Sequence, residues 1–126
     1  MVHNSILASD QKIQETPQEA DFYRGALLFK ALSDETRVRI MHILSCGELC
    51  ACEILKYFDI SQPTLSHHLA ILSESGLVET RKEGKWIHYR IHPRTARELH
   101  DFFKLLTEPT HTCLCKTRTP QGDLSC

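Results

Sequence analysis

The stretch that decides the fold is Ser61-Gln62-Pro63-Thr64-Leu65-Ser66-His67-His68-Leu69-Ala70-Ile71-Leu72-Ser73-Glu74-Ser75-Gly76. Ser61 is a favourable helix N-cap, Pro63 is tolerated in the first turn, and Gly76 commonly ends a helix. The apolar residues that recur at helical spacing, and so share one face, are Leu65, Leu69 and Leu72. The stretch therefore predicts a helix that is polar at its start and apolar along one side.

A β-hairpin is predicted directly after this helix. Residues 77–82 and 86–91 are extended, β-prone runs, and Glu83-Gly84 between them is typical of a turn. Apolar periodicity predicts four more helices, the second of them capped by Ser33, at about 18–32, 34–46, 48–59 and 93–107. A short helix, a turn, a capped helix and then a basic hairpin is the order of a winged helix-turn-helix. The predicted fold class is therefore mostly α with a small β-hairpin.

The chain has 126 residues, which is enough for one domain with its own core. We expect a mobile arm over residues 1–17, a winged helix-turn-helix domain over 18–108 and a cysteine-containing tail over 109–126. No apolar run is long enough for a membrane span, and the start has no secretory pattern. We therefore expect a cytoplasmic protein with reduced thiols and no membrane partner. No Gly-rich phosphate loop is present, so no organic cofactor is expected.

Charge is unevenly distributed along the chain. Residues 61–97 carry six basic and three acidic side chains, whereas residues 1–35 carry three basic and six acidic ones. A basic surface of this kind suits a polyanion such as DNA. In a helix-turn-helix the start of the second helix enters the major groove, and contacts to phosphates fix the orientation of the protein.

The candidate DNA contacts fall into two groups. The polar residues expected to face outward from the start of the 61–75 helix, toward base edges, are Gln62, Thr64, Ser66 and His67. The basic residues expected at the hairpin tip, against phosphates, are Arg81, Lys82 and Lys85. Trp86 and Tyr89 are expected to anchor the hairpin to the core. The predicted partner is double-stranded DNA.

A homodimer is also expected. A single winged helix makes few contacts, so two copies would bind half-sites about 34 Å apart. The first and last predicted helices carry more large apolar residues than a small core needs. These candidate interface residues are Phe22, Leu27, Phe29, Phe102, Phe103 and Leu106.

Four motifs resemble those of the ArsR/SmtB family of metal-responsive repressors, over about residues 20–107. They are Ala31-Leu32-Ser33-Asp34-Glu35-Thr36-Arg37-Val38-Arg39-Ile40, Glu48-Leu49-Cys50-Ala51-Cys52-Glu53, Ser61-Gln62-Pro63-Thr64-Leu65-Ser66-His67-His68-Leu69 and Gly84-Lys85-Trp86-Ile87-His88-Tyr89-Arg90. The second motif resembles the E-L-C-x-C-D pattern of arsenical and cadmium/lead sensors. The fourth resembles the wing of the arsenical repressors. The resemblance implies a homodimeric repressor that releases operator DNA when its inducer binds.

Six cysteines in a reducing compartment indicate a metal or redox site. Cys50 and Cys52 lie near the start of a predicted helix, where the N-terminus lowers a thiol pKa and favours the thiolate that binds soft metals and metalloids. Residues two apart on a regular helix point about 200° apart, so one ion could bind both thiols only if the first turn opened. That deformation would reach the neighbouring DNA-contacting helix, which gives a mechanism for release.

A trivalent arsenic or antimony species binds three thiolates, so a third cysteine is needed. In the arsenical pattern it follows in the same helix, where this chain has Leu55, and residues 1–45 lack the cysteines of the cadmium/lead sensors. The candidates for the third ligand are the tail pair Cys113 and Cys115, followed by Cys46 and Cys126. The site could form within one chain or between two.

Alternatives stay open at this point. The same fold could respond to cadmium or lead, or to thiol oxidation or sulfide through a disulfide between the two cysteine pairs. The D-x-H zinc pattern of the family's last helix is not matched at His100. A thiol enzyme would need a base beside its nucleophile, and no Cys–His arrangement occurs near Cys50. The leading prediction is a repressor, without catalytic residues, that trivalent arsenic or antimony induces.

Overall fold

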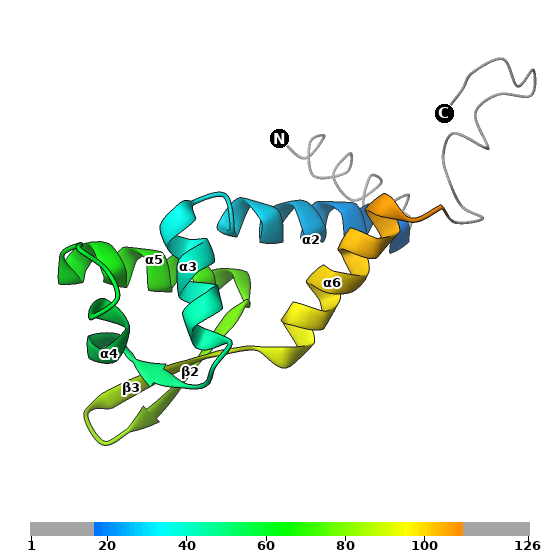
Figure 1. Cartoon of the computed structure of the whole chain (residues 1–126). Coiled ribbons are helices and arrows are strands. Elements are labelled where there is room, and N and C mark those ends of the chain that lie inside the picture. The colour runs from blue at the N-terminus through cyan, green and yellow to red at the C-terminus, as the bar shows by residue number, and fades with distance from the viewer. Residues whose placement is uncertain (1–16, 110–126) are drawn as a thin grey trace, which may run out of the picture.

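The computed structural model describes residues 17–109, so the expected N-terminal arm and the tail with Cys113, Cys115 and Cys126 lie outside the described residues. The elements in chain order are α2 (Pro17–Ala31), α3 (Glu35–Leu44), β1 (Leu49–Cys50), α4 (Ala51–Leu55), α5 (Gln62–Ser75), β2 (Val78–Glu83), β3 (Trp86–Ile91) and α6 (Pro93–Thr107). They form a mostly helical domain with a small antiparallel sheet (Figure 1), which confirms the predicted fold class. Within the described chain, no helix has the length and apolar character needed to cross a membrane.

Local capping explains where the central helices begin and end. Ser61 caps α5 by accepting a hydrogen bond from the Thr64 amide at 3.3 Å, and Gly76 ends the helix with a φ of 87°, as predicted. The predicted Ser33 cap is wrong by one residue. Asp34 caps α3, accepting hydrogen bonds from the amides of Thr36 at 2.8 Å and Arg37 at 3.2 Å. A carboxylate accepts two amides there, whereas the Ser33 hydroxyl donates to the carbonyl of Lys30 at 2.7 Å.

The sheet has three strands in the order β1-β3-β2, not the two of the predicted hairpin. The helix predicted over residues 48–59 is also wrong, because Leu49–Cys50 forms a strand and only Ala51–Leu55 is helical. Leu49 pairs with Tyr89 and Cys50 with His88 on β3. A strand of two residues leaves no periodicity in the sequence, and its partner lies about 40 positions away along the chain, so only the tertiary structure determines it.

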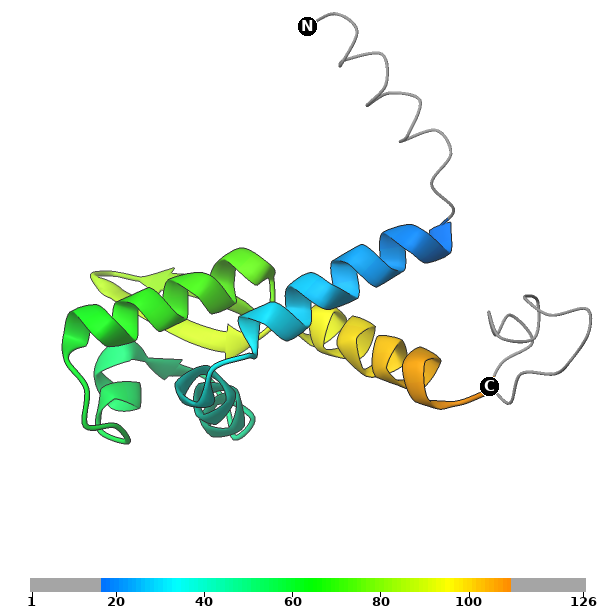
Figure 2. The same ribbon diagram turned by 90° about the horizontal axis from the view of Figure 1, so that it is seen from above.

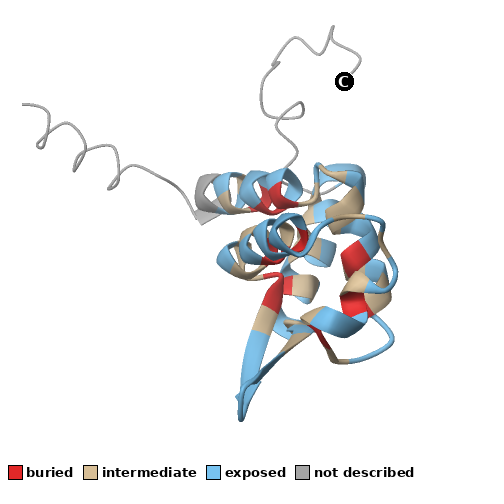
Figure 3. Cartoon of the chain, turned by 90° about the vertical axis from the view of Figure 1, so that its left-hand side faces the viewer, coloured by how far each residue is buried: buried red, intermediate tan, exposed pale blue. Residues whose placement is uncertain are grey.

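The core lies where the helices meet the base of the sheet. Its buried residues are Leu28, Ala31, Ile40, Leu44, Ile54, Leu65, Leu69, Leu72, Leu77 and Val78. They include all three leucines of the predicted apolar face of α5. Figure 3 shows these buried segments gathered in the body, whereas the far end of the hairpin projects beyond it and is exposed. The hairpin is therefore a wing.

The first turn of α5 and the turn of the wing lie at one end of the molecule, and the C-terminal end of α6 lies at the opposite end (Figures 1 and 2). The first turn of α5 and the turn of the wing are thus far from the end of α6, whereas the C-terminal end of α5 contacts α2, where Arg24 Nη1 donates to the carbonyl of Ser75 at 3.0 Å. This distance allows α6 to take part in a dimer contact without covering the first turn of α5.

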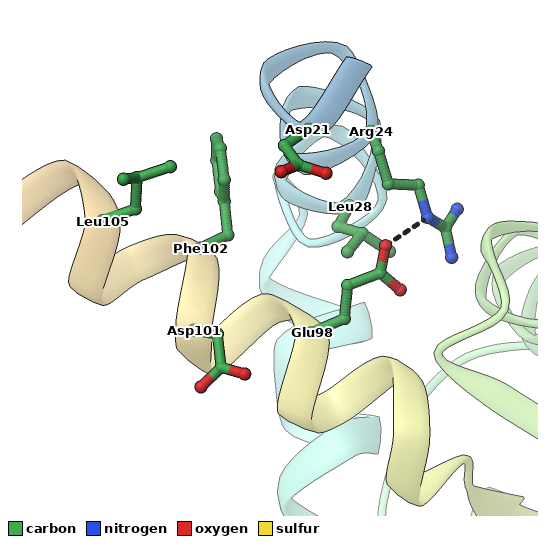
Figure 4. Close-up of a pocket in the computed structure, with 8 residues that line it drawn as sticks. Asp21, Arg24, Leu28, Glu98, Asp101, Phe102 and Leu105 are labelled. Atoms are coloured by element: carbon green, nitrogen blue, oxygen red, sulfur yellow. Dashed lines mark hydrogen bonds and ion pairs between the residues drawn. The ribbon is translucent and has the colours of Figure 1, made fainter. Parts of the chain in front are cut away.

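Helices α2 and α6 pack closely at Gly25. A Cβ built on Gly25 would overlap the ring of Phe102, so a side chain at this position would force the ring to move. The Phe102 ring lies 6.2 Å from the ring of Phe22 and 5.8 Å from that of Phe29, between centroids. Figure 4 shows Phe102 beside α2 and the ion pair between Arg24 Nε and Glu98 Oε2, which measures 3.1 Å.

The apolar residues predicted on these two helices divide into two sets. Phe22 and Phe102 are half-buried between α2 and α6 of the same chain. The others remain exposed, and with Tyr23 they form an apolar surface made of Tyr23, Leu27, Phe29, Phe103 and Leu106. An exposed apolar area of this kind marks an interaction site.

Candidate DNA-binding surface and thiol site

Helix α5 presents its predicted base-contacting residues to solvent. Gln62, Thr64, Ser66 and His67 are all exposed, because Leu65 and its neighbours one turn apart hold the opposite face in the core. The Thr64 hydroxyl accepts a hydrogen bond from the Ser61 hydroxyl at 2.9 Å, so it also takes part in the cap. The arrangement offers short polar side chains at a helix N-terminus, which favours both base edges and phosphate oxygens.

A polar contact that the sequence analysis missed fixes α5 against α3. Arg37 Nη1 lies 3.1 Å from His68 Nδ1, and Arg37 Nε donates to the carbonyl of Ala31 at 2.6 Å. His68 is half-buried, unlike His67 beside it. The two residues lie 31 positions apart, so no local pattern predicted their contact.

Of the four cations of the wing, Arg81 and Arg90 are paired with carboxylates and two lysines are free. Lys82 and Lys85 are exposed, and no carboxylate of residues 21–109 forms an ion pair with either. Arg81, by contrast, donates to both carboxylate oxygens of Glu48, from Nη2 to Oε1 at 2.5 Å and from Nε to Oε1 and Oε2 at 3.2 Å each. The hydrogen bond to Arg81 lowers the pKa of Glu48, and the same contact raises the pKa of Arg81.

The two aromatic residues of the wing differ in burial. Tyr89 packs against the core, as predicted. The anchoring role predicted for Trp86 is wrong, because its side chain is 54% exposed. Trp86 pairs with Glu83 at the last rung of the hairpin, too far from the body to reach the core. It therefore belongs to the exposed end of the wing with Lys82 and Lys85.

The two thiols of the C-x-C motif meet without any opening of the helix. Cys50 Sγ lies 2.8 Å from Cys52 Sγ, so the expected separation of about 200° is wrong. Cys50 is not a helical residue. It is the extended N-cap of α4, with φ −85° and ψ 164°, and only Cys52 lies inside the helix. The proposed deformation of the first turn therefore loses its premise.

The surroundings of Cys50 favour the protonated form of its thiol. A hydrogen bond with Cys52, burial and a hydrogen bond with the Glu53 carboxylate together raise the pKa of Cys50, so the expectation that the helix end lowers it is wrong. Helix α4 has only five residues, and Glu53 already accepts the Cys50 amide at 2.9 Å. The backbone hydrogen bond of that amide to Glu53 lowers the pKa of Glu53. The site thus places the Cys50 thiol, whose pKa is raised, close to the Cys52 sulfur and beside a carboxylate.

The third ligand is not found near this pair. Between residues 17 and 109, no group of three or more His, Cys, Asp or Glu side chains is placed to hold a metal ion. Cys46 is exposed and lines a surface hollow with His42 and Tyr57. The predicted ligands Cys113 and Cys115 belong to the part of the chain outside the description. The structure thus brings together two of the four predicted thiol ligands.

A helix-turn-helix formed by α4 and α5, flanked by a basic wing, defines a winged helix-turn-helix DNA-binding regulator. A family model described as "Bacterial regulatory protein, arsR family" matches residues 34–80. The arsenical resistance operon repressor of Staphylococcus aureus is 40% identical over 89 residues, which cover 71% of this chain and 86% of that protein. The chain therefore belongs to the ArsR family, whose members are DNA-binding transcriptional regulators and not enzymes.

Two further similarities bear on assembly and inducer. The cadmium resistance transcriptional regulatory protein CadC homolog of Staphylococcus aureus is 44% identical over 75 residues, or 59% of this chain and 62% of that protein. The homodimeric winged helix-turn-helix DNA-binding domain of Mb0332 from Mycobacterium bovis has a TM-score of 0.60 and 30% identity, covering 74% of this chain and 87% of that one.

Proposed function

We propose that this protein is a homodimeric repressor of an arsenical-resistance operon, which releases its operator in the cytoplasm when trivalent arsenic or antimony binds its thiols. The observation that carries the proposal is the 2.8 Å separation of Cys50 Sγ and Cys52 Sγ. These thiols lie at the start of α4, directly ahead of the DNA-contacting helix α5. Membership of the ArsR family supplies the DNA-binding half of the proposal.

The chemistry of the thiol pair suits a trivalent metalloid. Arsenous acid is neutral and carries three hydroxyl groups on arsenic. Each thiol replaces one hydroxyl, so an As–S bond forms, an As–O bond breaks, and the thiol proton leaves with the hydroxide as water. Three thiols therefore bind one arsenic without any change in oxidation state or net charge. The raised pKa of Cys50 does not oppose this exchange, whereas a divalent cation must first displace the thiol proton.

Cys50 and Cys52 would supply two of the three sulfur ligands. We assign the third to Cys113 or Cys115, in the tail that follows α6. The third sulfur would come from the same chain or from its partner in the dimer. Soft sulfur ligands of this kind favour arsenic and antimony over harder ions.

Dimer formation would use the apolar surface of α2 and α6. Tyr23 is 70% exposed and Phe103 is 54% exposed, which is a large apolar area for a monomer of this size. The homodimeric state of the Mycobacterium bovis domain, which has the same fold, supports this assembly. Two copies would place two α5 helices on successive turns of the same face of operator DNA.

Cadmium or lead is the second candidate inducer, and similarity to a cadmium resistance regulator favours it. Both ions bind thiolates, and Glu53 beside the thiol pair could add a carboxylate oxygen. A thiol-oxidation response is a third outcome of the same experiment, because it too needs only cysteines.

Operator release by the reduced, full-length protein distinguishes these candidates. Labelled operator DNA is titrated with protein and then with arsenite, trivalent antimony, cadmium, lead, zinc or a mild oxidant in parallel. We expect the two trivalent species to release DNA at the lowest concentrations. Release at the lowest concentration by cadmium or lead would instead show that the site senses divalent ions. Release by the oxidant alone would show that the cysteines form a redox switch.

The DNA contacts are tested by two substitutions with different expected effects. Lys85→Ala should weaken binding equally on all sequences and lower the slope of log K against log salt by about 0.9, the value for one phosphate contact. Gln62→Ala should instead reduce the preference for the operator over a mismatched site by about 1–3 kcal/mol, with an unchanged salt slope. Fluorescence anisotropy at several salt concentrations measures both. Equal loss of base preference in both variants would contradict the assignment.

A further inference from the structure

We infer that Glu48 is a positioning residue that links the thiol pair to the wing, through its ion pair with Arg81. The inference rests on the proposed function, because it states how binding at Cys50 and Cys52 changes the DNA-binding surface. The link passes through the sheet, so it is separate from any path from α4 to α5.

The thiol pair and the wing share one row of the sheet. Cys50 on β1 pairs with His88 on β3, and His88 pairs with Arg81 on β2. Glu48 lies two residues before Cys50, so it follows the same face of the extended chain. Its carboxylate crosses β3 and accepts hydrogen bonds from Arg81 Nη2 at 2.5 Å and Nε at 3.2 Å. The ion pair thus joins the residue directly before β1 to β2, and β1 and β2 are not neighbours in the sheet.

His88, on the central strand β3, lies next to this ion pair. Its Nδ1 is 4.0 Å from Glu48, and its Nε2 is 3.3 Å from Glu83, which also lies 3.6 Å from Arg81 Nη1. The charges of Arg81 and Glu83 are therefore engaged within the sheet. Lys82 and Lys85 remain as the free cations of the wing, and their position depends on how β2 and β3 are held.

The short length of β1 makes the connection direct. Glu48 directly precedes β1, so only Leu49 separates it from Cys50. An arsenic atom that binds between Cys50 and Cys52 must separate the two sulfurs, which are only 2.8 Å apart, and this displaces the segment. The two-point contact between the Arg81 guanidinium and a carboxylate depends on orientation, so the displacement either moves the wing or breaks the pair. Either change alters the position of Lys82 and Lys85 relative to DNA.

The same sheet provides a matched control. Arg90 Nε donates to Glu79 Oε2 at 2.7 Å, so this pair has the same chemistry and similar exposure. It joins β2 to β3 only and does not reach β1. Glu79→Gln should therefore remove an ion pair of the wing without affecting the connection to the thiol pair.

The experiment uses the full chain, with Glu48→Gln as the test and Glu79→Gln as the control. Arsenite binding is measured for each protein. The ratio of its operator affinity without arsenite to that with arsenite is its coupling factor. Trp86 is the only tryptophan of the chain and lies at the exposed end of the wing, so its emission reports the wing without DNA. We expect Glu48→Gln to bind arsenite as the wild type does, but with a coupling factor lower by about threefold or more. The change in Trp86 emission when arsenite binds should also be smaller.

Each outcome decides the inference. If Glu48→Gln keeps the coupling factor and the Trp86 response of the wild type, the inference is wrong. The inference is also wrong if Glu79→Gln reduces the coupling factor and the Trp86 response as much as Glu48→Gln does. Loss of any ion pair of the wing would then be enough to weaken the coupling. Urea unfolding of both variants checks that stability differs little between them. If arsenite does not release DNA from the wild type, the proposed function fails, which is a distinct result.

Discussion

Replacing Cys50 with serine should abolish release of the operator by trivalent arsenic while leaving DNA binding intact. The hydroxyl is a hard ligand, so the substitution removes one sulfur from the site and should raise the inducer concentration for half-release by about a hundredfold or more. The fold should tolerate the change, because serine is a preferred helix N-cap and Cys50 occupies that position in α4. Anisotropy of labelled operator DNA, titrated with arsenite, measures both properties.

Cys46→Ser is the matched control, because Cys46 is exposed and is not in hydrogen-bonding contact with the thiol pair. It should respond to arsenite as the wild type does. Cys113→Ser and Cys115→Ser test the third ligand, and at least one of them should blunt the response. If both single variants and the double variant respond normally, the assignment to the tail is wrong. Loss of the response in Cys46→Ser would move the third ligand to that position.

Gly25→Ala should destabilise the protein, although alanine is the better helix former. In an ordinary helix interior this substitution stabilises by about 0.5–1 kcal/mol. Here the new methyl group would overlap the Phe102 ring, so the ring must move away from Phe22 and Phe29 or α2 must separate from α6. Overpacking of this kind costs about 1–3 kcal/mol. Urea unfolding gives the sign of the change in the free energy of unfolding, and sedimentation gives the effect on the dimer.

A double-mutant cycle with Phe102→Ala isolates the contact. Once the ring is removed, Gly25→Ala should no longer cost stability and should recover the ordinary preference for alanine in a helix. If Gly25→Ala stabilises the wild-type background as well, the close approach of α2 and α6 is not a constraint in solution. The dimer should weaken together with stability, since the displaced helices carry the exposed residues Leu27 and Phe103.

The elements that local interactions define were predictable from the sequence. Helix α5 begins at its serine cap, ends at Gly76 and buries Leu65 and its partners, because capping and helical periodicity act within a few residues. The hairpin is equally local, since Glu83-Gly84 turns the chain between two β-prone runs. The exposure of Gln62 and its neighbours follows from the same periodicity.

Contacts between distant parts of the chain were not predictable in this way. Strand β1 exists because Leu49 and Cys50 pair with β3, and that pairing makes Cys50 an extended cap whose thiol meets Cys52. The predicted DNA contact Arg81 is held by Glu48, 33 positions earlier in the chain.

The sequence by itself therefore determined the winged helix-turn-helix, the polar and exposed start of helix α5 and the presence of a thiol motif. Only the tertiary structure decided how the two thiols meet, which wing cations are free and why Gly25 faces Phe102. The physical reason is how far apart in the sequence the interacting residues lie. Caps, turns and apolar periodicity depend on neighbours within about one helical turn, whereas strand pairing and helix packing depend on residues that only folding brings together.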